Sequence, residues 1–263
     1  WGYLCYFSHS SKKCPWPLAA PRLPPVFSPC SSESLARLPQ LRAARPSSSL
    51  AWLPCRKPKP ISDIVAAYSA GQRHFGENYV QELYEKSHSP EIQSQCPDIR
   101  WHFIGHCQSK NVKRLSQVNN LDTMETVDSE KLANLLHKEW TKTSAYESGS
   151  QLRVFIQVNT SNEEQKYGCQ PNQVVGLAGH LLENCPAISL AGLMTIGSLE
   201  ASHQAEDGNA DFERLVLCRR ELTAGIETWR RGAAGAEHGD VIKMGSTNVR
   251  VGSTIFGERN YSK

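Results

Sequence analysis

Residues 121–158 read LDTMETVDSEKLANLLHKEWTKTSAYESGSQLRVFIQV and contain the pattern that decides the fold. Residues 121–127 and 153–158 are short runs rich in apolar and β-branched side chains, which is typical of buried strands. Between them, Asp128 and Ser129 are placed to cap a helix over residues 130–141. A strand, a helix and a second strand in this order predict a βαβ unit with parallel strands.

The same alternation runs from residue 50 to near the C-terminus. Further strands are expected at residues 50–55, 73–76, 100–104, 188–196 and 249–255, with helical patterns between them. This gives seven strands, whereas a (β/α)8 TIM barrel has eight and spans about 200–250 residues. We predict an α/β fold of the TIM-barrel type that is one strand short. An open doubly wound sheet is the alternative, although no G-x-G-x-x-G follows the first strand.

Two segments carry groups that suit a single cofactor. Lys57 follows the first expected strand, and a lysine amine forms an imine with an aldehyde. Near the C-terminus, Ser246, Gly252, Ser253 and Thr254 lie in turns whose N–H and hydroxyl groups can hold a phosphate. Pyridoxal 5'-phosphate (PLP) contains both an aldehyde and a phosphate, so the two segments together favour PLP. Taken singly, each segment more often represents an exposed loop lysine or an ordinary turn.

Arg250, in the last expected strand, limits the chemistry of such a site. A guanidinium has donors only and does not give up its proton. Facing the pyridine nitrogen of PLP, it would therefore leave that nitrogen unprotonated and make the ring a weaker electron sink. Arg250 favours a protein that holds the cofactor, or a racemase with strong bases, over a transaminase.

Asn78 and two histidines complete the set of candidate site residues. Asn78 is expected at the end of a strand, where it would orient the cofactor or, alternatively, cap a helix. His102 and His106 are four residues apart on one strand, which separates them by about 13 Å along its axis. No Cys or acidic residue is placed to complete their ligand set, so no metal site is predicted.

Composition separates the N-terminal segment from the rest of the chain. Residues 1–60 contain nine Lys or Arg, one acidic residue and 11 of the 15 prolines. We expect residues 1–50 to be a disordered Pro/Ser/Arg-rich extension. Its acid-poor, Arg/Ser-rich part also fits an organelle transit peptide, and the other alternative is a segment without specific function. Residues 51–263 are expected to form the PLP-binding barrel.

Charge and cysteine content limit the partners and the compartment. The chain carries +3 overall and +8 in residues 1–60, so the remainder carries −5, which argues against nucleic acid as the main partner. No apolar run approaches the roughly 20 residues that cross a bilayer, so no membrane association is expected. The nine cysteines include no CxxC pair, which favours reduced thiols. We expect a cytoplasmic monomer, with a mitochondrial location as the alternative.

Several motifs resemble those of the pyridoxal phosphate homeostasis protein family. They are residues 75–82 (FGENYVQE), 101–106 (WHFIGH), 157–160 (QVNT), 192–197 (GLMTIG) and 245–261. The resemblance implies a single barrel of the alanine racemase N-terminal type that binds PLP. It implies Lys57 as the imine lysine, Arg250 at the pyridine nitrogen, and Gly252, Ser253 and Thr254 near the phosphate. It also implies buffering of PLP and its delivery to apo PLP-dependent enzymes, without established catalysis.

The chain departs from the family pattern at two places. Pro54 interrupts the first strand, and a proline cannot donate to a sheet ladder. Residues 228–240 show no strand pattern, although the family has its seventh strand there, with a Ser-Met-Gly-Met-Ser motif at the phosphate. An incomplete barrel leaves two strand edges unpaired. The alternatives to a PLP carrier are therefore a PLP-dependent amino-acid racemase or decarboxylase, and a non-functional product of a degenerate or misspliced gene.

Overall fold

The computed structural model describes residues 4–8, 51–52, 60–163, 166–196, 210–232 and 246–251. Side chains are described for residues 60–163, 166–196 and 210–225. Lys57, Gly252, Ser253 and Thr254 lie outside these ranges, as does most of the N-terminal segment. No helix in the described part of the chain is long and apolar enough to cross a membrane.

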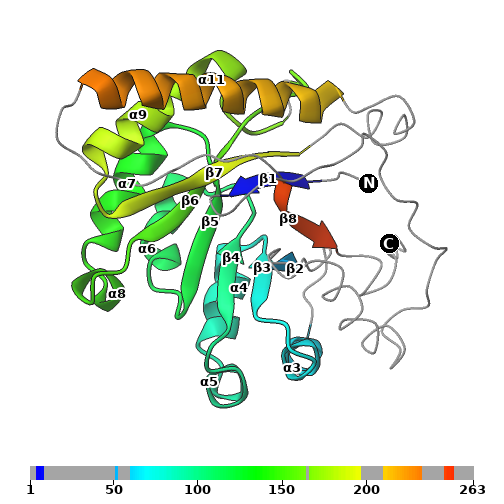
Figure 1. The fold of residues 1–263 in the computed structure, drawn as a ribbon. Coiled ribbons are helices and arrows are strands. Elements are labelled where there is room, and N and C mark those ends of the chain that lie inside the picture. The colour runs from blue at the N-terminus through cyan, green and yellow to red at the C-terminus, as the bar shows by residue number, and fades with distance from the viewer. Residues whose placement is uncertain are drawn as a thin grey trace.

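Eight strands form a ring in the order β1-β7-β6-β5-β4-β3-β2-β8, which closes on itself (Figure 1). The strands are β1 (Leu4–Ser8), β2 (Ala51–Trp52), β3 (His74–Glu77), β4 (Arg100–Phe103), β5 (Leu121–Val127), β6 (Leu152–Gln157), β7 (Ile188–Ile196) and β8 (Ser246–Val251). All neighbouring pairs from β8 through β2 to β7 are parallel. The ring confirms the barrel and excludes the open doubly wound sheet.

Helices follow the parallel strands and cover the outside of the barrel (Figure 1). They are α3 (Ile61–Ser69), α4 (Val80–Ser87), α5 (Pro90–Gln95), α6 (Val112–Leu115), α7 (Glu130–Trp140), α8 (Ser144–Glu147), α9 (Val174–Asn184) and α11 (Ala210–Gly232), with 3-10 turns η1 (Ser109–Asn111) and η2 (Pro171–Gln173). The helix α11 packs against α9 and β7. The helix expected over residues 130–141 matches α7. The helices α5 and α8 were not predicted, because they are too short to show a period.

The helix α7 shows how the sequence produces these elements. Its buried residues Leu132, Ala133, Leu136 and Trp140 recur at helical spacing and face the strands. Ser129 occupies the expected N-cap position with an extended backbone. Its hydroxyl, however, donates to the Asp128 carboxylate at 3.1 Å and does not accept from a helix N–H. The predicted cap position is confirmed, and the predicted capping hydrogen bond is not formed.

The strand β1 fills the gap in the ring that the sequence pattern leaves. It lies between β7 and β8 and pairs antiparallel with both, so that Tyr6 is opposite Met194 on one side and Asn248 on the other. The prediction of disorder over residues 1–50 is therefore wrong for Leu4–Ser8. The ring that was expected to be one strand short is closed by β1, which supplies the pairing that residues 228–240 were expected to lack. Of that stretch, residues 228–232 belong to α11, and the rest lies outside the described residues.

The first parallel strand is described at two residues of its expected range, 50–55. Ala51 and Trp52 form β2. Trp52 pairs with Phe75 of β3 and with Val251 of β8, so β2 still joins the two neighbouring strands.

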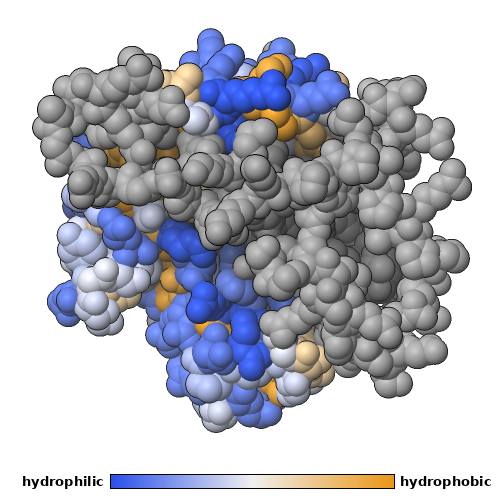
Figure 2. All heavy atoms as spheres, in the orientation of Figure 1, coloured by the Kyte–Doolittle hydropathy of each residue, from blue (hydrophilic) through white to orange (hydrophobic). Residues whose placement is uncertain are grey.

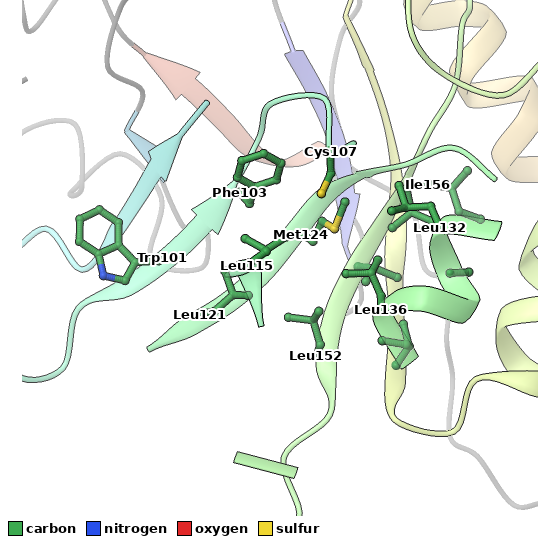
Figure 3. Close-up of a cluster of buried hydrophobic side chains, with 14 of the residues drawn as sticks. Trp101, Phe103, Cys107, Leu115, Leu121, Met124, Leu132, Leu136, Leu152 and Ile156 are labelled. Carbon is green, nitrogen blue, oxygen red and sulfur yellow. The ribbon is translucent and has the colours of Figure 1, made fainter. Parts of the chain in front are cut away.

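The main hydrophobic core lies between the strands and the surrounding helices. Figure 3 shows Trp101 and Phe103 of β4, Leu121 and Met124 of β5, and Leu136 of α7 in this cluster. Because successive side chains of a strand point to opposite faces, residues next to these in sequence point into the barrel. Several of these inward residues are polar, including His102 and Glu125, and both are buried. A small separate cluster of Phe155 and Met194 is also buried.

The outer surface visible in Figure 2 is mainly hydrophilic over the described residues. Large hydrophobic residues that are exposed include Leu217 of α11 and Val175 and Leu182 of α9. These lie on the two helices that cover β7.

We predict that Tyr6→Pro destabilises the barrel. Proline lacks the N–H group that a central strand donates to its ladder, and an unpaired buried backbone group costs about 1–3 kcal/mol. Urea denaturation should show a lower free energy of unfolding than in Tyr6→Phe, which keeps the backbone donor. Equal stability of the two variants would mean that β1 does not close the ring in solution.

Candidate functional site

The carboxyl ends of the parallel strands share one rim of the barrel, where function is located in folds of this type. Asn78 follows β3, Gly105 comes two residues after β4, and Asn159 comes two residues after β6. Thr126 and Thr195 lie near the ends of β5 and β7. These residues, with the loops that follow them, are the described part of the rim.

Three strand ends are fixed together at Gly105. A Cβ atom at this position would lie 1.9 Å from the Asn78 carbonyl oxygen, so only glycine permits this approach of the two backbones. The Thr126 hydroxyl donates to the Gly105 carbonyl at 2.7 Å. The Ile104 N–H donates to the Glu77 carbonyl at 3.0 Å. The backbone next to Asn78 is thus held by contacts with both following strands.

A second set of contacts fixes the ends of β6 and β7. The Thr160 and Thr195 hydroxyls lie 2.7 Å apart, and the Thr195 hydroxyl donates to the Val158 carbonyl at 2.9 Å. The Asn159 side chain donates to the carbonyls of Glu163 and Lys166 at 2.9 and 3.2 Å. The loop after β6 is therefore folded back onto the strand that precedes it.

This loop meets the loop after β4 through an aromatic pair. The rings of His106 and Tyr167 stack with centroids 3.7 Å apart and an interplanar angle of 11°. The next residue, Gly168, has φ +127°, and a Cβ atom there would lie 2.7 Å from the Asn159 N atom. Tyr167 is exposed, so the pair forms a partly solvated wall on the rim between β4 and β6.

The structure brings together the strands that carry or precede most of the predicted site residues. Arg250 of β8 is opposite Ala51 of β2, and β2 is next to β3, which ends just before Asn78. Ser246 is the first residue of β8 and is paired with Phe7 of β1. It is six residues from Gly252, near the opposite end of the strand, so the backbone gives no support for its predicted place near the phosphate. The side chains of Arg250 and Ser246, like Lys57 and residues 252–254, lie outside the described ones.

The groups on these neighbouring strands suit PLP chemically. The strands β8, β2 and β3 run parallel, so their carboxyl ends lie on the same rim. In sequence, Lys57 comes five residues after Trp52, and Gly252 directly follows Val251. An amine, hydroxyl groups and a glycine are residue types that match the aldehyde and the phosphate of the cofactor. The donor set therefore fits PLP.

Glu77 does not face this site, although it precedes Asn78. Its carboxylate lies 2.6 Å from the Lys86 ammonium on α4, and Lys86 also pairs with Glu82 at 2.5 Å. Glu77 and Lys86 are both buried. Burial raises the pKa of Glu77 to about 7, against the opposing effect of Lys86. This pair fixes α4 to β3 and was missed in the sequence because its partners are nine residues apart on different elements.

Burial disfavours the thiolate form of the cysteines whose side chains are described. Cys96, Cys107, Cys169, Cys185 and Cys218 are buried and form no disulfide, as expected for reduced thiols. Burial raises the pKa of Cys107 and that of Cys169 to about 12. Thiolates at these two positions near the rim are therefore disfavoured at neutral pH.

Comparisons with known proteins agree on one family. The family described as "Alanine racemase, N-terminal domain" matches residues 60–260. The chain is 45% identical over 240 residues to the pyridoxal phosphate homeostasis protein of Mus musculus, covering 88% of this chain and 84% of that protein. It is 39% identical over 223 residues to the protein of the same name from Haemophilus influenzae, covering 83% of this chain and 89% of that protein.

Solved structures with the same fold include a PLP-bound protein. PipY of Synechococcus elongatus PCC7942, determined with PLP bound, is 27% identical with a TM-score of 0.62, covering 85% of this chain and all of that one. An alanine racemase of Clostridium difficile 630 is 13% identical with a TM-score of 0.51, covering 76% of this chain and 50% of that one. At this lower identity the racemase shares the fold alone.

We predict that Gly105→Ala lowers the free energy of unfolding by at least about 2 kcal/mol, because the new methyl group overlaps the Asn78 carbonyl. Gly176→Ala, in α9 where nothing lies within 4 Å, is the matched control. It should be neutral or up to about 1 kcal/mol more stable, since alanine favours a helix over glycine. Urea denaturation of both variants tests this difference. Equal effects would contradict the close contact at the rim.

We also predict a pH dependence from Glu77. Its pKa is about 7 in the folded chain, above the ordinary value of 4.5. The native state therefore binds more protons than the unfolded state between these values, and the free energy of unfolding falls as pH rises from 4.5 to 7. The contribution is on the order of 1–3 kcal/mol. Glu77→Gln should reduce this fall, measured by urea denaturation at pH 5 and 7, whereas Glu91→Gln at an exposed position should keep it.

Proposed function

Because the chain belongs to the pyridoxal phosphate homeostasis protein family, built on the alanine racemase N-terminal fold, we propose that it binds PLP and acts in the intracellular buffering and delivery of that cofactor. The observation that carries the proposal is the adjacency of β8, β2 and β3 in the closed ring. In sequence, Lys57 follows β2, Arg250 belongs to β8, and residues 252–254 follow β8.

Each proposed contact has a distinct task. Lys57 would bind the aldehyde carbon through its amine, and Gly252, Ser253 and Thr254 would donate to the phosphate oxygens. The fixed backbone at Gly105 holds Asn78 at the rim, where its amide would orient the ring. Ser246 is retained as a candidate phosphate donor from the sequence pattern alone. PLP supplies an electron sink when bound, and the protein residues decide how far that sink is used.

Arg250 supports a holding role over catalysis. It donates hydrogen bonds without releasing a proton, so facing the pyridine nitrogen it would keep that nitrogen unprotonated. Cys107 and Cys169 lie near the rim, but burial raises the pKa of both thiols. They are therefore poorly suited as bases at neutral pH. We therefore propose a carrier without turnover, and keep an amino-acid racemase or decarboxylase as the alternative.

The remaining features of the proposal concern the setting in the cell. We propose that the carrier acts as a monomer, is cytoplasmic or also mitochondrial, and delivers PLP to apo PLP-dependent enzymes. The excess of basic over acidic residues in residues 1–60 supports the mitochondrial alternative. The acidic balance of the remaining chain supports a role without nucleic acid.

The test is the absorbance of the purified chain with PLP, before and after borohydride reduction, followed by peptide mapping. The expected result is a visible band of lysine-linked cofactor and a reduced label on Lys57. Lys57→Ala should lose the band and the label, and Lys59→Ala, two residues away, should keep both. An unchanged spectrum in Lys57→Ala would overturn the assignment of that lysine.

Two further outcomes separate the alternatives. Turnover of an amino acid that is lost in Lys57→Ala would establish the enzyme in place of the carrier. A chain without a cooperative unfolding transition and without a specific label would establish the non-functional product. The closed ring of strands supports a cooperative transition.

A further inference from the structure

Three side chains from adjacent strands converge inside the barrel, away from the rim. His74 begins β3, His102 is the third residue of β4, and Asp122 is the second residue of β5. His74 Nδ1 lies 2.8 Å from His102 Nε2, and His102 Nε2 lies 3.8 Å from Asp122 Oδ2. All three atoms lie within 4.8 Å of one another. Phe75, Trp101 and Phe103 belong to the outer core, so His74 and His102 point inward. Asp122 lies at the register shift between β4 and β5, and its carboxylate reaches His102.

These separations are close to those of a metal ligand set. A tetrahedral Zn²⁺ ion with bonds of about 2.0–2.1 Å holds its ligand atoms about 3.3 Å apart. Two imidazole nitrogens and one carboxylate oxygen, with water in the fourth position, form a familiar zinc donor set. Because the ligands come from three hydrogen-bonded neighbouring strands, only small side-chain movements would close the set around an ion.

The buried Glu125 side chain behind His102 occupies the place of the outer partner that many metal-bound histidines have. His102 Nδ1 lies 2.5 Å from Glu125 Oε1, and both residues are buried. A metal-bound histidine commonly donates its other ring N–H to a carboxylate, which fixes the tautomer and the direction of the ligating nitrogen. In the tautomer that carries its proton on Nδ1, His102 donates to Glu125 and leaves Nε2 as the acceptor that faces His74 and Asp122.

Asp122 supplies the anionic member of the set. Its carboxylate also accepts a hydrogen bond from the Thr123 hydroxyl at 2.6 Å.

Arg153 of β6 competes for the same carboxylate. Its NH1 atom lies 3.1 Å from Asp122 Oδ2, and its side chain is 41% exposed. It can therefore move into solvent when a cation takes its place. The Asp122 side chain is 19% exposed, which gives an ion access from the end of the barrel opposite the rim.

We propose that His74 Nδ1, His102 Nε2 and Asp122 Oδ2 bind a divalent transition-metal ion, with Zn²⁺ best matched to the donor set, and that the ion ties β3, β4 and β5 together at the amino end of the barrel. The site shares no residue with the proposed PLP contacts. It therefore stands or falls independently of the proposed function.

The test is titration of the full chain, freed of metal with a chelator, by Zn²⁺ in calorimetry and by Co²⁺ in visible spectroscopy. We expect one equivalent of each ion to bind, a higher melting temperature with Zn²⁺, and the absorption of tetrahedral Co²⁺ with nitrogen and oxygen ligands. His74→Ala and Asp122→Asn should each weaken Zn²⁺ binding by more than about 100-fold, since loss of an outer partner alone costs 10–100-fold. His180→Ala, on α9 away from the cluster, is the matched control and should bind as the unmodified chain does.

Arg153→Ala provides a second test that does not depend on the stability of the ligand variants. Removing the competing guanidinium should strengthen Zn²⁺ binding several-fold, which a purely structural role of the cluster does not predict. Absence of Zn²⁺ binding, or binding unchanged in His74→Ala, would overturn the proposal. Intense cobalt–thiolate bands would overturn it as well, by assigning the metal to cysteines.

Discussion

The barrel depends on the pairing of every strand edge. An unpaired edge exposes a row of N–H and C=O groups, which either remain in water or recruit another chain. The parallel strands leave two such edges, on β7 and β8, because the chain between residues 226 and 246 provides no described strand to join them. The strand β1 satisfies both edges from the N-terminus of the chain.

Antiparallel pairing allows β1 to take the place of a parallel strand between β7 and β8. A strand between two parallel neighbours needs donors and acceptors on both of its edges, and an antiparallel strand supplies them with a different spacing of hydrogen bonds. The register shift between Tyr6 and Phe7 is the local adjustment on the β8 side. The closed ring then places β8 next to β2, so Arg250 lies opposite Ala51 and the proposed cofactor contacts depend on this closure.

The two ends of the barrel have different chemistry because each strand has two faces. Outward residues such as Trp101 and Phe103 build the core with the helices. At the amino end of the barrel the inward residues include polar ones, and His102 contacts His74 there. At the carboxyl end the backbones of Gly105 and Asn78 are in close contact. One set of strands thus carries a proposed metal site and a proposed PLP site without shared residues.

Local signals in the sequence predicted much of this arrangement. Residues 121–127 and 188–196 match β5 and β7 because buried strands bounded by polar residues are recognisable from side-chain character alone. The helices α5 and α8 were not predicted, because segments of six and four residues are too short to show a helical period. The strand β1 escaped because its stability comes from two distant partners and not from its own sequence.

The proposed PLP site could be predicted from the sequence, whereas the proposed metal site could not. The motifs around Asn78 and Arg250 identify the family and the expected PLP site, since these short segments carry their chemistry in consecutive residues. The comparison of His102 with His106 along one strand found no metal pair, whereas the structure places His74 of the adjacent strand 2.8 Å away. The sequence by itself determined the order of the parallel strands and the long helices, the family and the cofactor chemistry, because these depend on local patterns. Only the tertiary structure decided which strand closes the ring and which polar side chains meet inside it, because strand pairing joins residues that are far apart in the chain.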